Sequence, residues 1–405
     1  MSQHIFYYFI TIASRFTGRF VLLFILANAI TLNEFGLFTY ALTLSGIFLL
    51  FFDYGHNVQL LKDIPRNISN IPIMVGTSII VKVRVIAIIS FIFYAFDFFS
   101  LLNISHEEQT TVMLLLLATV GVAFINLFVA PFKAVGRFEV EALIAFIDNI
   151  LTIIVVLAAN TYYGFDAAIL AYFLSKTFIF IMAFSIYKRN YKIIFFSTND
   201  KTSSTPIFPL AIYEIIGGLY LMIDTVILKI YVPNEDIAIY QVGIRLLFGT
   251  QIILSIVNSV FLPRLSAIKG TPRFTLLFRK LNLLVAFTGL TLSAFLYVFG
   301  EGIVVFLFGD LFSQFSELLI YFCLIIFLRY LTAMYSAITL LDDKHVIRTF
   351  AILLTTILLI ILDFIIIPLY GINGAAVVLL FAHILLLAIF MTLTYLKYKK
   401  LFIFL

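Results

Sequence analysis

The chain has 405 residues, of which 63% are hydrophobic and 12% are charged, with a mean hydropathy of +1.15 and a net charge of +5. Water-soluble domains are about half apolar and about a quarter charged, so this composition excludes a soluble fold. Apolar stretches of the roughly 20 residues that a helix needs to cross a bilayer recur from end to end, which predicts an all-α polytopic membrane protein.

Twelve transmembrane helices are predicted, joined by short connections. Their ranges are 5–31, 36–56, 72–96, 109–131, 141–161, 166–187, 207–231, 237–261, 281–300, 313–340, 349–368 and 373–396. The longest connection follows the sixth span and holds a polar run near the midpoint of the chain. This pattern predicts an N-terminal six-helix lobe at 1–196, a cytoplasmic linker at 197–206 and a C-terminal six-helix lobe at 207–405.

The basic residues outside the spans all fall on one side of the predicted membrane. Eighteen of the 26 Lys and Arg residues lie in the linker, the C-terminal tail and the connections that follow even-numbered spans. The connections that follow odd-numbered spans contain none. Because basic residues mark cytoplasmic segments, both termini are predicted to be cytoplasmic. This asymmetry also accounts for the positive net charge without a nucleic-acid partner.

Short motifs recur at about half the chain length, which suggests an internal repeat. NEFGLF at 33–38 resembles NEDIAIY at 234–240, and YGFDAA at 163–168 resembles YGINGAA at 370–376, with offsets of 201, 202 and 207 residues. Since each half would hold six spans, the two lobes would share one orientation and be parallel-related. Such a pair of lobes is a transporter architecture, in which the substrate lies between the lobes near the midplane.

Eight basic residues lie within the predicted spans: Arg15, Arg19, Lys82, Arg84, Lys176, Lys229, Arg245 and Arg329. An ionised side chain at mid-bilayer costs about 2.5–3.5 kcal/mol, so such groups are expected to face a cavity or a partner. Arg15 and Arg19 are four residues apart and share a helix face. They fit either a solvated cationic cavity or an internal ion-pair network with Asp148 or Asp224.

Lys82 and Arg84 are two residues apart and point in different directions; the sequence favours Arg84 as the inward-facing residue. The candidates for a cationic substrate site are Arg15, Arg19, Arg84, Arg245 and Arg329. The candidates for charge pairing or ion coupling are Asp148, Glu214, Asp224 and Asp363. The excess of basic over acidic residues favours an anionic substrate group, such as a diphosphate, which arginine binds through paired donors.

Several kinds of site are missing from the sequence. There is no Gly-rich phosphate loop for a nucleotide-driven motor and no His/Cys cluster for a metal, so no cofactor is expected. No nucleophile and base are visibly paired, and an enzyme is not expected. Cys323 is the only cysteine, and His383 is expected to be a packed core residue.

Six short segments follow one another in a recognisable order. They are NEFGLFTY at 33–40, FDYG at 52–55, IDTVIL at 223–228, YQVGIRL at 240–246, FLPRLS at 261–266 and IPLYGINGAA at 367–376. Their order and spacing, with the length and the twelve spans, resemble bacterial polysaccharide repeat-unit flippases of the Wzx, or O-antigen translocase, type. That family belongs to the multidrug/oligosaccharidyl-lipid/polysaccharide exporter (MOP) superfamily.

The resemblance implies a V-shaped pair of six-helix lobes that translocates undecaprenyl-diphosphate-linked oligosaccharide across the bacterial inner membrane. The product would be O-antigen of lipopolysaccharide, capsule or exopolysaccharide, and the mechanism would be alternating access. The implied partners are this lipid-linked substrate, membrane lipid, a polysaccharide polymerase and a chain-length regulator. Arg19, Arg84 and Arg245 match positions where basic residues are common in the family, whereas Arg15 and Arg329 are candidates from their depth alone.

Three alternative functions are weighed against this one. A drug or metabolite cation antiporter of the same superfamily would share the fold but is expected to have a more acidic cavity. A lipid II flippase is expected to carry extra C-terminal spans. A polysaccharide polymerase would need a large outer loop with functional arginines, and the predicted outer connections contain no arginine.

Overall fold

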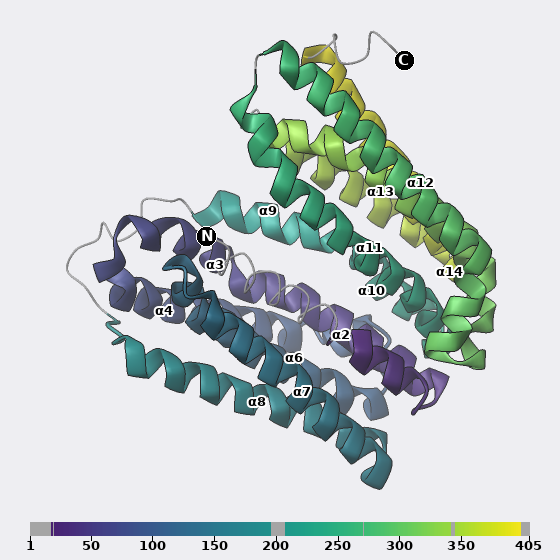
Figure 1. Ribbon diagram of the computed structural model, residues 1–405. Coiled ribbons are helices and arrows are strands. Elements are labelled where there is room, and N and C mark those ends of the chain that lie inside the picture. The colour runs from purple at the N-terminus through teal and green to yellow at the C-terminus, as the bar shows by residue number, and fades with distance from the viewer. Residues whose placement is uncertain (1–17, 19, 196–206, 270, 342–344, 398–405) are drawn as a thin grey trace. The chain divides into compact units, whose positions relative to one another are not determined.

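A computed structural model of the chain describes residues 18, 20–195, 207–269, 271–341 and 345–397. The described secondary structure is helical throughout, with turns between the helices (Figure 1). Contacts divide the chain into two compact units, Met1–Met222 and Ile223–Leu405, called unit 1 and unit 2 below. Each unit is described by itself.

Unit 1 is a bundle built around one central helix. Its elements are a helical segment at 20–27, α2 (Leu32–Asp53), α3 (His56–Asp63), η1 (Ile64–Arg66), η2 (Ile68–Asn70), α4 (Ile71–Ala95), α5 (Phe98–Leu101), α6 (His106–Ala134), α7 (Phe138–Tyr163), α8 (Phe165–Asn190) and α9 (Ile207–Leu219). Helix α6 packs against α2, α3, α4, α7 and α8. It is therefore the helix around which the rest of unit 1 is assembled.

Side-chain caps fix the starts of two helices in unit 1. Thr31 caps α2 in a reciprocal pair with Glu34, and Ser105 caps α6 in the same way with Glu108. Each pair satisfies backbone N–H groups that the first helical turn leaves unbonded. The NEFGLF motif thus lies at a helix start because Glu34 completes the cap.

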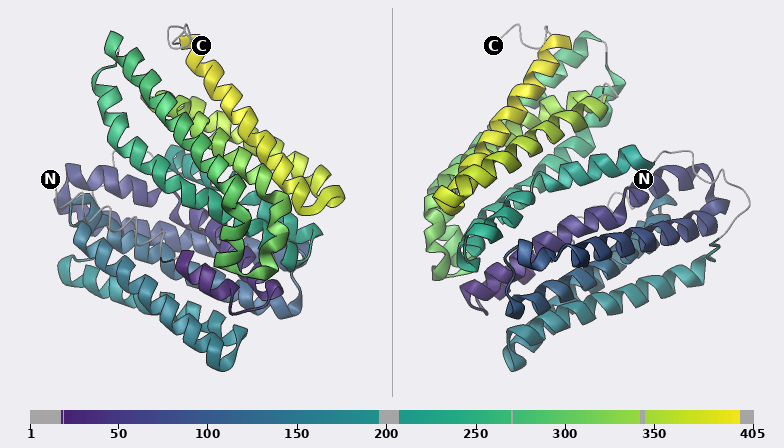
Figure 2. Two further views of the ribbon diagram at one scale, coloured as in Figure 1. Left: turned by 45° about the vertical axis from the view of Figure 1, so that its right-hand side comes forward. Right: turned by 180° about the vertical axis from the view of Figure 1, so that it is seen from behind.

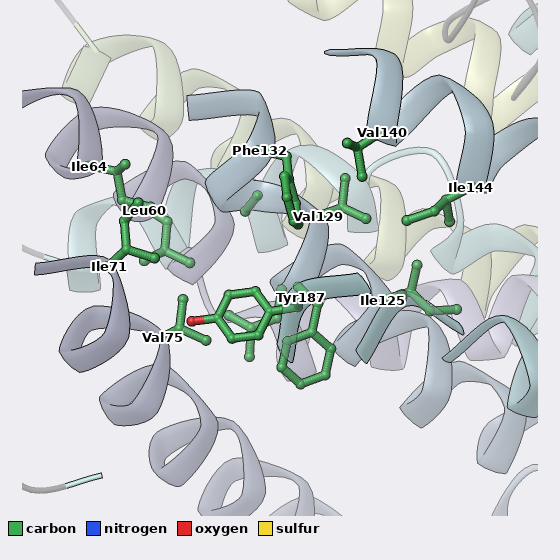
Figure 3. Packing of buried hydrophobic residues seen from close by; sticks show 14 of the residues in the cluster. Leu60, Ile64, Ile71, Val75, Ile125, Val129, Phe132, Val140, Ile144 and Tyr187 are labelled. Carbon is green, nitrogen blue, oxygen red and sulfur yellow. The ribbon is translucent and has the colours of Figure 1, made fainter. Parts of the chain in front are cut away.

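An apolar core ties together the ends of α3, α4, α6, α7 and α8. Leu60 of α3, Val75 of α4 and Phe132 of α6 belong to it, and all three are almost fully buried. Figure 3 shows the ring of Tyr187 of α8 among these side chains. The Tyr187 hydroxyl donates to the carbonyl of Lys192 at 3.2 Å, so its one polar group is satisfied inside an apolar core.

Unit 2 contains the remaining helices. They are α10 (Ile223–Tyr231), α11 (Asn234–Ala267), α12 (Pro272–Phe308), η3 (Asp310–Phe315), α13 (Ser316–Leu341) and α14 (His345–Lys397). Helix α13 packs against α11, α12 and α14, and the views in Figure 2 show α12, α13 and α14 running alongside one another. Helix α14 is two helices joined at Gly371, whose φ of 55° and ψ of −136° interrupt the helical backbone.

The predicted fold class, an all-α polytopic membrane protein, is confirmed. Among the residues that the structure describes, eight helices are long and apolar enough to cross a membrane, and the bent pair α9 and α10 makes a ninth candidate. Helix α14 covers the two predicted spans 349–368 and 373–396, and α11 covers 237–261. Most of the predicted first span lies outside the described residues. The described helices are consistent with the other eleven predicted spans and therefore with a total of twelve.

The seventh predicted span differs from the prediction of one continuous helix. It is divided into α9 and α10, which are bent by 48° at the break between them. The division of the chain by contacts falls at this break, after Met222, because α9 packs on α2 and α3 whereas α10 packs on α14 and α11. The predicted linker 197–206 lies outside the described residues, and the lobe boundaries 1–196 and 207–405 stay a prediction.

The two members of the YG repeat occupy corresponding places in the structure. Gly164 separates α7 from α8, and Gly371 separates the two parts of α14; their φ values are 84° and 55°. A positive φ is open to glycine at little steric cost. The repeat therefore marks the tight turn before α8 in unit 1 and before the second part of α14 in unit 2.

Candidate functional site

Two of the five candidate arginines, Arg15 and Arg19, lie outside the described residues. Gly18, between them in sequence, is described and lies against Asn149 of α7. A Cβ atom built on Gly18 would lie 2.2 Å from the Asn149 Cγ atom, so this position has no room for a side chain. Asn149 follows Asp148, one of the acidic candidates.

Lys82, and not Arg84, is the residue of α4 that is turned into unit 1. The Lys82 side chain is fully buried; its Nζ atom lies 2.5 Å from Oδ1 of Asp53 on α2 and 3.0 Å from the carbonyl oxygen of Ala123 on α6. Arg84 is exposed. The expectation that Arg84 is the inward-facing residue was wrong, because the buried face of α4 includes Ile71, Val75, Ser78 and Lys82, at helical spacing.

Asp148 pairs with a lysine inside unit 1. The Lys176 Nζ atom on α8 lies 2.6 Å from Oδ1 of Asp148 on α7 and 3.0 Å from the Thr152 hydroxyl. Lys176 also lies over the ring of Tyr172, 5.1 Å from its centroid. Asp148 was a candidate for pairing with Arg15 or Arg19; these arginines lie outside the described residues, and among the described residues the partner of Asp148 is Lys176.

Two buried carboxyl groups of unit 2 lie on neighbouring helices, α10 and α14. Asp224 is 1% exposed and accepts hydrogen bonds from its neighbour Thr225 N–H at 2.7 Å and from the Tyr240 hydroxyl. Asp363 is 0% exposed, and neither of its oxygens has a hydrogen-bond partner among the described residues. The two carboxyl groups interact electrostatically, so they form one acidic site in unit 2.

The two arginines of unit 2 are both half-buried. Arg245 lies on α11 and Arg329 on α13, and these helices pack together. The Arg329 guanidinium donates to the side-chain oxygen of Gln251 at 2.5 Å. His383 of α14 is buried as expected, with Nδ1 2.8 Å from the carbonyl oxygen of Leu379.

Asp53 was not among the candidate residues from the sequence, and its pairing with Lys82 was missed. A usable signal was present, because apolar and small residues at 71, 75 and 78 place residue 82 on their face by helical periodicity. Glu214 of α9 is half-buried and interacts electrostatically with both Asp53 and Lys82. The structure thus brings together three charged groups from α2, α4 and α9.

No cluster of three or more His, Cys, Asp or Glu residues that suits a metal is found among the described residues. The sequence matches the family described as polysaccharide biosynthesis protein over residues 3–269. No curated protein sequence matches the chain.

Several solved structures share the fold. A lipid II flippase, MurJ, in an inward closed conformation superposes with a TM-score of 0.77 at 18% identity, covering 96% of this chain and 87% of that one. An inward-facing multidrug resistance MATE family transporter of the MOP superfamily gives 0.71 at 13% identity, covering 97% and 94%. A MOP superfamily transporter from Pyrococcus furiosus, noted for the reverse polarity of its binding pocket, gives 0.65 at 15% identity, covering 97% and 95%.

Proposed function

Because the chain belongs to the polysaccharide biosynthesis protein family, we propose that it is a flippase for undecaprenyl-diphosphate-linked oligosaccharide repeat units in the bacterial inner membrane. The family match over residues 3–269 is the observation that carries this proposal. A fold shared with a lipid II flippase and with MOP transporters supports it. The product would be O-antigen, capsule or exopolysaccharide, and both termini would be cytoplasmic.

The physical task of such a flippase requires a transport path lined by positively charged side chains. A diphosphate with a polar glycan cannot cross hydrocarbon unaided. Transfer of an isolated ionised group from water to an apolar medium costs on the order of tens of kcal/mol. A water-filled path with fixed guanidinium groups lowers this barrier, while the polyprenyl tail stays in lipid. The path must bind the substrate comparably in its two facing states, because tight binding in one state alone would trap it.

Arg15, Arg19, Arg84, Arg245 and Arg329 are proposed to bind the diphosphate. The structure bears on this choice through the lysines: Lys82 and Lys176 each lie within 2.6 Å of a carboxylate oxygen of their own unit. Those two ammonium groups are therefore used inside unit 1. A guanidinium group also suits a diphosphate better than an ammonium, since its planar fork of donors can engage two oxygens at once.

The Asp224–Asp363 site is proposed to couple transport to an ion gradient. A buried carboxylate without hydrogen-bond partners is costly, so Asp363 is expected to take up a proton or a cation. With Na⁺ as the probe, added NaCl is expected to raise the unfolding temperature of the purified protein more than choline chloride does. Asp363→Asn should remove this difference and the exposed control Asp310→Asn should keep it; an equal response in both variants would contradict Na⁺ binding at Asp363.

The main experiment is deletion followed by analysis of lipid extracts and surface glycan. Loss of the flippase should deplete the surface polymer and accumulate lipid-linked repeat units. Complementation by Arg15→Ala or Arg19→Ala should fail although the protein reaches the membrane, and the exposed control Arg189→Ala should succeed. Wild-type glycan from both Arg15→Ala and Arg19→Ala would remove these residues from the site.

The same deletion separates the flippase from a drug or metabolite antiporter. An antiporter of the same superfamily would leave the surface glycan and the lipid-linked intermediates unchanged. Its loss would instead alter sensitivity to toxic compounds. That combination would overturn the flippase proposal.

A further inference from the structure

The charged cluster of unit 1 joins four helices. It consists of Asp53 of α2, Lys82 of α4, Asn126 of α6 and Glu214 of α9, and is called the Lys82 cluster below. The Lys82 ammonium lies 2.5 Å from Asp53 Oδ1, and the Asn126 amide donates to the other Asp53 oxygen at 3.5 Å. The Lys82 side chain is 0% exposed, so the cation is entirely enclosed within the protein.

Close contacts fix how α9 lies on α2. A Cβ atom built on Gly55 would lie 2.8 Å from the backbone nitrogen of Ala211, and one built on Gly218 would lie 2.2 Å from Leu50 Cδ1. As the number along α9 rises from 211 to 218, the partner number falls from 55 to 50. Helix α9 therefore runs antiparallel to the C-terminal end of α2, and at these two contacts the segments are too close to admit a larger side chain at either glycine.

This register places Glu214 across from Asp53. Ala211, Glu214 and Gly218 are separated by three and four residues, so they share one face of α9. Between the contacts at Gly55 and Leu50, the residue of α2 that corresponds to Glu214 is Asp53. The electrostatic interaction of Glu214 with both Asp53 and Lys82 agrees with this placement.

We propose that Lys82 is a positioning residue that holds α9, the first half of the broken seventh span, against α2 by neutralising two carboxylates that face each other. Without the ammonium, Asp53 and Glu214 would repel each other in surroundings of low dielectric, where charge interactions are strong. The chain passes from unit 1 to unit 2 after Met222. Lys82 would thus hold the last helix of unit 1 in place shortly before that passage.

The test is a disulfide between α2 and α9 in the full-length protein in membranes. Leu50→Cys and Gly218→Cys are introduced with Cys323→Ser, because Cys323 is the only native cysteine. A Cβ atom at 218 would lie 3.1 Å from Leu50 Cγ, so the two new sulfur atoms come within reach of a bond. The measured quantity is the rate of disulfide formation under a mild oxidant.

In this background, Lys82→Met is expected to slow disulfide formation several-fold, because α9 moves away from α2. Lys82→Arg, which keeps the charge, should keep most of the rate. Adding Glu214→Gln and Asp53→Asn to Lys82→Met should restore the rate, because no charges then face each other. Lys176→Met is the matched control: it unpairs another buried lysine of unit 1 and should leave the rate unchanged.

Two outcomes would overturn the proposal. One is an unchanged rate in Lys82→Met; the other is a rate in the neutral triple variant that is as slow as in Lys82→Met. If Lys82→Met does not accumulate in membranes, the comparison uses the two variants that each remove one carboxylate, Lys82→Met/Asp53→Asn and Lys82→Met/Glu214→Gln. Both are expected to keep most of the rate because no two like charges then face each other, and a slow rate in both would overturn the proposal.

Discussion

The Lys176–Asp148 pair allows a quantitative test of internal charge compensation in unit 1. The Nζ and Oδ1 atoms are 2.6 Å apart, and the side chains are 9% and 27% exposed. Removing one partner of a buried pair costs about 3–5 kcal/mol, because the other charge stays buried and unpaired. Since Asp148 keeps some exposure, Lys176→Met is expected to lower the free energy of unfolding by about 3 kcal/mol, near the lower limit of this range.

The double variant Lys176→Met/Asp148→Asn should recover most of that loss, because a neutral pair leaves no buried charge. The assay is unfolding of the purified protein in detergent for the wild type, both single variants and the double variant, which gives the coupling energy directly. Lys188→Met, at the exposed end of the same helix, controls for loss of a lysine. A double variant that is no more stable than Lys176→Met would refute the reasoning.

Three further predictions concern packing and orientation. Gly243→Ala should destabilise unit 2 by about 1–3 kcal/mol, measured by unfolding, because the new Cβ would lie 2.3 Å from the Phe322 ring. Gly371→Ala should cost about 1–3 kcal/mol in the same assay, since φ is +55° there; unchanged stability would contradict the assigned turn. A cysteine at Glu107 should react with membrane-impermeant reagents only from the side opposite the cytoplasm, and labelling from the cytoplasmic side would contradict the predicted topology.

The fold was predictable from the sequence because the bilayer imposes simple rules. Apolar length and the placement of lysine and arginine predict where helices lie and how they are oriented. Most helix ends lie within four residues of the predicted ones, whereas α11 ends six residues later than predicted and α12 is longer than predicted by nine and eight residues at its two ends. The break in the seventh span was not visible in this way. Its two halves, α9 and α10, are both apolar; what separates them is packing on different units, which hydropathy does not record.

The charged residues were predictable as a group but not as pairs. Depth in a span marks Lys82, Lys176 and Asp148 as groups in need of a partner. Which partner each one finds depends on the rotation and register of helices distant in sequence. Asp53 and Lys82 are 29 residues apart, and their contact follows from how α4 lies beside α2 and α6. The choice of Lys82 over Arg84 as the inward-facing residue depends on the periodicity of α4 alone, so it could have been made from the sequence.

The single-glycine turns at Gly164 and Gly371 have a consequence for proteolysis on the side of the membrane opposite the cytoplasm. Both lie on the side predicted to face away from the cytoplasm, and each joins two long helices without an intervening loop. A protease added on that side therefore has almost no extended peptide to bind at these two places. Epitope tags or cleavage sites for that side should be inserted elsewhere, such as near Asp310, where η3 offers a longer connection.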